Sequence, residues 1–93
     1  MAMFLHGGGN KNLKKSEIIG IFDLDSASVG QKTKEFLRRT EKQGKTRNIG
    51  TGLPKSFLVT VSKTEGETVY FSALAATTLA QRAKADYTNL SKE

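Results

Sequence analysis

The side chains best suited to do chemistry are the cations in the middle third of the chain. The 93 residues include 15 Lys or Arg and 9 Asp or Glu, a formal net charge of +6. Residues 26–63 hold nine cations and two carboxylates, which leaves +7, whereas residues 1–25 sum to zero and residues 64–93 sum to −1. Positive charge concentrated in this way indicates a polyanion partner, with a solubilising surface as the alternative.

Two of these cations flank a loop whose composition suits phosphate groups. Arg47 and Lys55 enclose the sequence Gly50-Thr51-Gly52-Leu53-Pro54, and residues 43–62 contain no carboxylate. Exposed backbone amides and uncompensated cations are the groups that proteins use to contact nucleic-acid phosphates. The candidate nucleic-acid contacts are Lys55, Arg47, Lys45, Arg38 and Arg39.

The cations just before this loop have carboxylates at helical spacing. Glu35 precedes Arg39 by four residues, and Glu41 precedes Lys45 by four residues. Such pairs are favourable on the surface of a helix. They are typical of an ordinary solvated face, so they weaken the argument that this helix itself binds DNA.

Other residue types that could support catalysis lack partners in the sequence. His6 is the only histidine, and the chain has no cysteine, which excludes disulfides, thiolate zinc sites and cysteine nucleophiles. Gly7-Gly8-Gly9 matches neither phosphate-loop fingerprint and is interpreted as a turn or a subunit contact. We therefore expect no enzyme activity, no cofactor, no metal and no small-molecule substrate.

Asp23 and Asp25 are close enough in the sequence to suggest acid–base chemistry or a divalent-cation site. Two residues apart on a strand, they would point to the same face. The favoured interpretation is structural, with Asp25 capping the following helix or ending the strand.

The elements that must position these residues follow from apolar periodicity. An amphipathic helix is expected from Ser26 or Ser28 to about Gln43, with a serine N-cap and Gly44 as its stop. One stripe of this helix is formed by Val29, Thr33, Phe36, Leu37 and Thr40. Strands are expected at residues 3–6, 18–24, 46–49, 56–61 and 68–72, and a second helix at residues 74–84.

The expected fold class is α+β, in the order β-β-α-β-β-β-α. A small, largely antiparallel sheet would carry one central amphipathic helix and a short C-terminal helix. Residues 1–85 would form a single domain, and residues 86–93 a polar, frayed tail. The apolar runs are too short to span a membrane and the N-terminus does not resemble a signal peptide, so a cytoplasmic protein without a membrane partner is expected.

Five collinear segments resemble a known family. They are MFLHGGGN, KSEIIGIFDLDSASV, TKEFLRR, LPKSFLVTV and VYFSALAATTLAQRA, spread over residues 3–83. Together they are similar to the RemA/RemB family of bacterial extracellular matrix regulatory proteins, and most similar to its RemB (YaaB-like) branch. The most specific segments are Ile21-Phe22-Asp23, Pro54-Lys55-Ser56 and residues 72–79.

The resemblance implies a DNA-binding transcriptional regulator associated with biofilm matrix genes. RemA-type proteins form ring-shaped homo-oligomers whose basic surface engages double-stranded DNA, and Lys55 occupies the matching turn before a strand. The chain departs from the family at Ala73, Ala75 and Ala76, where proline and serines are usual. The alternative function is an oligomeric protein-interaction or scaffold module that does not bind nucleic acid.

Overall fold

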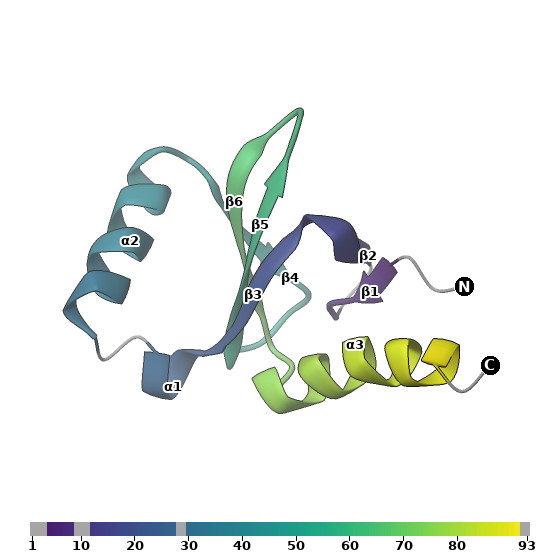
Figure 1. The fold of residues 1–93 in the computed structure, drawn as a ribbon. Coiled ribbons are helices and arrows are strands. Elements are labelled where there is room, and N and C mark those ends of the chain that lie inside the picture. The colour runs from purple at the N-terminus through teal and green to yellow at the C-terminus, as the bar shows by residue number, and fades with distance from the viewer. Residues whose placement is uncertain (1–3, 9–11, 28–29, 92–93) are drawn as a thin grey trace.

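A four-stranded sheet lies at the centre of the computed structural model, which describes residues 4–8, 12–27 and 30–91 (Figure 1). Its strands, in the spatial order β3-β5-β6-β4, are β3 (Ile18–Asp23), β5 (Ser56–Ser62), β6 (Gly66–Ser72) and β4 (Thr46–Ile49). β5 is antiparallel to β3 and to β6, whereas β4 is parallel to β6. The sheet is therefore mixed, with β3 and β4 at its two edges.

Both faces of the sheet are covered, and the burial of β5 reflects this. All five residues from Ser56 to Thr60 are buried, as expected for a central strand with a layer on each side. Successive side chains alternate between the faces. Phe57 and Val59 pack in one cluster, and Leu58 packs in the other.

Helix α2 (Gln31–Lys42) covers the first face (Figure 1). Phe36 and Leu37 pack against the cluster formed by Phe57, Val59 and Val69. Thr40 is buried, and its hydroxyl donates to the Leu37 carbonyl at 2.9 Å. Four of the five residues expected in the apolar stripe thus lie on the inner side of the helix; the fifth, Val29, falls outside the described residues.

The opposite face is covered by a hairpin and a second helix. β1 (Phe4–His6) pairs with β2 (Asn12–Lys14), and a 3-10 turn, η1 (Lys15–Glu17), leads from β2 into β3. Helix α3 (Ala76–Ser91) lies beside them (Figure 1). Leu5 and Leu13 of the hairpin and Leu79 of α3 pack against the sheet in one apolar cluster. The sheet residues of this cluster are Ile49, Leu58 and Tyr70.

The α+β class is confirmed, and the elements differ from expectation in a few places. β2 is an additional strand, and α3 begins at Ala76 and continues to Ser91, through most of the expected tail. The predicted serine N-cap of the central helix is wrong. A separate turn, α1 (Leu24–Ala27), precedes α2, and Gly30 is the N-cap of α2 without any side-chain hydrogen bond.

The Asp23–Asp25 pair is also corrected by the structure. β3 ends at Asp23 and Asp25 lies within α1, so the two do not share a strand face. The Asp23 carboxylate accepts a hydrogen bond from the Asp25 backbone N–H at 3.1 Å. Asp23, and not Asp25, is therefore the capping residue of this turn.

None of the helices described is both long enough and apolar enough to cross a membrane.

Candidate nucleic-acid interface

Five cations follow one another along the last turns of α2, the connection after it and the first residues of β4. We call this set the basic ridge: Arg38, Arg39, Lys42, Lys45 and Arg47. Residues 38–47 contain one carboxylate, Glu41, so the segment carries +4. All of the ridge side chains are exposed except Lys45, which is half-buried.

The ridge turns sharply at Gly44 because the helix ends there in a Schellman motif. The Gly44 N–H donates to Glu41 O at 3.0 Å, and the Lys45 N–H donates to Thr40 O at 2.9 Å. Gly44 has a φ of +70°, which L side chains rarely adopt. This geometry brings the start of β4 directly beside the end of α2.

Arg47 lies against the carbonyls exposed by this turn. One of its terminal nitrogens donates to Gly44 O at 2.8 Å and to Thr46 O at 2.9 Å. A guanidinium has five N–H donors, so three remain for a ligand. The two bonds hold the planar group in place, which suits it to recognise a phosphate.

Lys45 joins the ridge to the turn between β5 and β6. Its ammonium donates to the Glu65 carbonyl at 2.7 Å, and its own carbonyl accepts from the Val69 N–H at 2.9 Å. Lys45 is thus a structural cation as much as a surface charge, and it fixes β4 against the hairpin.

The helical cations of the ridge have fewer restraints. The Arg39 guanidinium lies over the Phe36 ring, 5.6 Å from its centre. Arg38 and Lys42 are four residues apart on the side of α2 that faces solvent. Lys42 was not among the expected contacts, although its place between Arg39 and Lys45 puts it inside the ridge.

The expected helical ion pairs are not what organises these cations. Because α2 ends at Lys42, Glu41 and Lys45 are not one turn apart on a helix. Glu35 accepts a hydrogen bond from the Gln31 side-chain amide at 3.4 Å. Of the two expected pairs, only Glu35 and Arg39 lie within α2 at the spacing of a helical pair.

Lys55 lies apart from the other four expected contacts. Its N–H donates to Ser72 O, whereas the carbonyl of Lys45 bonds Val69, three residues earlier on β6. At roughly 3.3 Å per residue, this separates the two lysines by about 10 Å along the strands, in addition to their separation across the sheet. The Lys55 carbonyl accepts from the Leu24 N–H at 3.0 Å, so Lys55 neighbours the acidic start of α1.

The glycine turn and the histidine have structural contacts. The Gly7 carbonyl accepts a hydrogen bond from the Ser72 hydroxyl at 2.6 Å, and the His6 carbonyl accepts one from the Arg82 guanidinium at 3.3 Å. Gly9 and the two residues after it fall outside the described part of the chain. For Gly7, the interpretation as a turn fits these contacts.

No family model and no curated protein matches the chain.

Proposed function

We propose that the protein is a DNA-binding regulator that acts in the cytoplasm as a symmetric homo-oligomer and contacts double-stranded DNA through the basic ridge. The observation that carries the proposal is the +4 charge of residues 38–47, which lie in the last turns of α2, the connection after it and the start of the edge strand β4. Exposed arginine and lysine side chains close together in this way suit the phosphate backbone of a duplex.

The ridge supports phosphate contacts better than it supports base recognition. Phosphate binding needs exposed cations with restrained geometry, which Arg47 has through its two carbonyl bonds. Base recognition in the major groove usually needs an element that enters the groove. Because α2 packs one side on the sheet, its free side offers mainly charge, and the expected binding is only weakly dependent on sequence.

Oligomerisation would multiply these weak contacts. Once one subunit of an oligomer is bound to DNA, the ridge of a second subunit binds the same duplex as an intramolecular step. The overall avidity therefore rises without a new type of interaction. Edge strands are natural places for subunits to meet, because their outer backbone groups lack strand partners. Within the described residues, β3 and β4 each pair on one side only.

The alternative, a protein-interaction module without nucleic-acid binding, is favoured by an apolar groove between β3 and α2. The groove has a volume of about 290 Å³ and includes Phe36 and Phe57. Two apolar side chains at its rim are exposed to solvent, Ile19 to 64% and Phe22 to 41%. Exposed apolar patches of this kind often mark contacts between proteins.

The proposed DNA surface can be tested with a pair of variants that change net charge equally. Arg38→Ala with Lys42→Ala removes two ridge cations, and Lys14→Ala with Lys63→Ala removes two exposed cations elsewhere. We expect the ridge variant to weaken binding to a labelled duplex and to lower the log–log salt slope by roughly 1.8, at about 0.9 per phosphate contact. The control variant should change the slope little.

Equal effects of the two variants would show that only net charge matters and would overturn the assignment of the ridge. A third variant, Lys55→Ala, separates the two regions of the sheet. If it alone reproduced the loss, the contact would lie at the start of β5 and not on the ridge.

A further inference from the structure

The apolar groove between β3 and α2 lies apart from the cations of the basic ridge. Phe57 and Val59 of β5 line it, and Phe36 lines it from α2. Ile19 and Phe22 form its rim on the β3 side. Because the lining and this rim are all apolar, covering the groove would remove a continuous apolar surface from water, which is favourable.

The rim is held in a fixed position by the local shape of β3. The ladder between β3 and β5 changes register between Ile18 and Gly20, so Ile19 is an extra residue at a bulge. The Phe22 ring lies over Gly20, where a Cβ would be only 2.6 Å from the ring. The same ring stacks on Phe57, with 5.1 Å between the centroids. Phe22 therefore presents an exposed aromatic face that is already ordered before a partner binds.

β3 also places this rim at the side of the molecule. Within the described part of the chain, β3 pairs with β5 and has no strand on its outer side. A bulge disrupts the regular ladder that would continue a sheet into a second molecule. We therefore expect a partner to contact β3 through the Ile19 and Phe22 side chains and not through a continuous sheet.

The two charged residues that line the groove have opposite signs and lie at its opposite ends. Glu67 pairs with Val61, one residue beyond the pair of Thr60 with Ile18, so it lies at the end where β3 begins. Lys32 is in the first turn of α2, which follows α1 beyond the end of β3 (Figure 1). A twofold axis across the groove exchanges its ends. Lys32 of each copy would then face Glu67 of the partner subunit.

We propose that this groove is the interface of a twofold-symmetric homodimer. Ile19 and Phe22 of each copy pack over the groove of the other, and Lys32 pairs with Glu67 of the partner subunit at both ends. The occupant is a second copy because the surface is complementary to itself, in its apolar rim and in the sign of its charges. The inference rests on the proposed homo-oligomer and assigns its contact surface.

The test is sedimentation velocity of the full chain at protein concentrations from about 1 to 500 μM. We expect wild-type protein to form dimers as the concentration rises. Lys32→Glu and Glu67→Lys each bring like charges together at both ends of the interface, so each should raise the dissociation constant at least about tenfold. An equimolar mixture of the two variants should dimerise again, because each end of the mixed dimer joins opposite charges.

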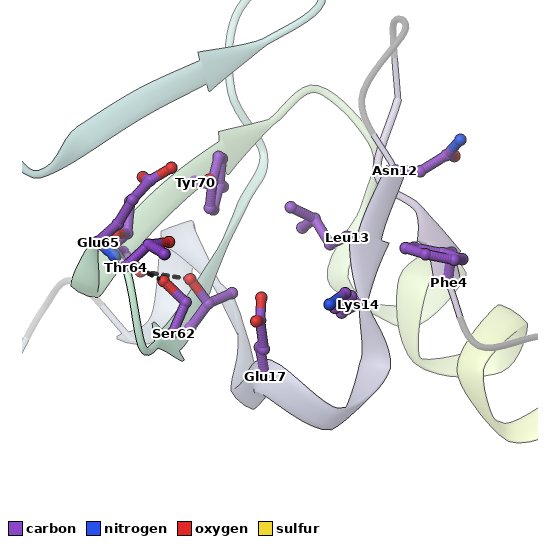
Figure 2. A pocket seen from close by; sticks show the side chains of 11 residues that line it. Phe4, Asn12, Leu13, Lys14, Glu17, Ser62, Thr64, Glu65 and Tyr70 are labelled. Carbon is purple, nitrogen blue, oxygen red and sulfur yellow. Dashed lines mark hydrogen bonds between the residues drawn. The ribbon is translucent and has the colours of Figure 1, made fainter.

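The matched controls make the same charge changes on the opposite face of the sheet. Lys14→Glu and Glu65→Lys alter residues that line a separate hollow there (Figure 2). Each should dimerise like the wild type, and mixing them should change nothing. Ile19→Ser tests the apolar rim without a change of charge. Since this side chain is 64% exposed, its replacement should weaken the dimer several-fold and leave the thermal unfolding of the monomer nearly unchanged.

Two results would overturn only the assigned interface. They are a wild-type oligomer whose dissociation is unchanged in Lys32→Glu and Ile19→Ser, and a mixture of Lys32→Glu with Glu67→Lys that stays as dissociated as either variant alone. Wild-type protein that remains monomeric over the whole range would overturn both the interface and the homo-oligomer. Duplex binding is measured separately, so none of these results decides whether the basic ridge contacts phosphates.

Discussion

Ser72 connects the two sheets of the molecule through a single buried hydroxyl. The residue is fully buried, its oxygen donates to Gly7 O at 2.6 Å, and it accepts from the Leu74 N–H at 3.1 Å. These bonds join the turn after β1 to the end of β6, 65 residues apart in the sequence. Gly8 lies beside the same residues, since a Cβ placed on it would be in ordinary van der Waals contact with the Ser72 and Leu74 side chains.

Replacing this hydroxyl should be costly. Ser72→Ala leaves a carbonyl and an N–H without their partner, and we expect it to lower the free energy of unfolding by about 2 kcal/mol in urea titrations. Ser62→Ala is the control, because the Glu65 N–H that it would release lies in an exposed turn and can bond to water. A loss in Ser62→Ala equal to that in Ser72→Ala would contradict the structural role of Ser72.

Removing the Thr68 hydroxyl should raise the free energy of unfolding, whereas removing the Ser72 hydroxyl lowers it. The buried Thr68 hydroxyl has no partner among the described residues, so Thr68→Val removes an unsatisfied polar group at nearly constant volume. We expect the free energy of unfolding to rise by about 1 kcal/mol in the same urea titrations. A decrease in stability on this substitution would mean that the hydroxyl is already satisfied in the native state.

Among the elements, the connection from α2 to β4 sets the shape of the basic ridge. Gly44→Ala places a side chain at a φ of +70° with no atom within 4 Å of the new Cβ, so its effect is purely conformational. We expect a loss of about 1 kcal/mol, measured by thermal or urea unfolding. Gly44→Asn should lose less, since asparagine tolerates this conformation better. Equal losses for alanine and asparagine would contradict the conformational explanation.

The elements that could be predicted from the sequence are those with a strong local pattern. The β5–β6 hairpin and β3 have runs of β-branched and aromatic residues, which are typical of strands. The inner side of α2 has apolar residues at helical spacing. β2 was missed because a three-residue strand with the sequence Asn-Leu-Lys offers one apolar residue to read. The extent of α3 was underestimated because polar residues late in a helix resemble a tail.

The arrangement of the cations depends on topology, which local patterns do not encode. Arg47 and Lys55 flank one loop in the sequence, but β4 runs parallel to β6, so the two ends of the loop meet different neighbours. Arg47 bonds Gly44 at the end of α2, and Lys55 bonds Ser72 and Leu24. The concentration of charge was visible in the sequence; its division into a ridge and a separate lysine was not.

At the scale of the whole molecule, the sheet separates two surface features. The basic ridge lies on the last turns of α2 and the start of β4, and a hollow of about 230 Å³ lined by Leu13 and Tyr70 lies on the face away from α2, beside the β1–β2 hairpin (Figures 1 and 2). Glu65 lies between them, since its carbonyl accepts from Lys45 and its side chain lines the hollow. A substitution in the β5–β6 turn would therefore affect both the basic ridge and the hollow.

The central claim is that the ridge binds duplex DNA through its phosphates, and its most direct test is a fluorescence anisotropy titration of a labelled duplex with the wild-type protein. Binding at about 50 mM salt should weaken by roughly two to three orders of magnitude at about 200 mM, as expected for five phosphate contacts and a log–log slope of roughly −4.5. Folded protein that leaves the anisotropy unchanged at the lower salt would contradict the claim and favour the protein-interaction module instead.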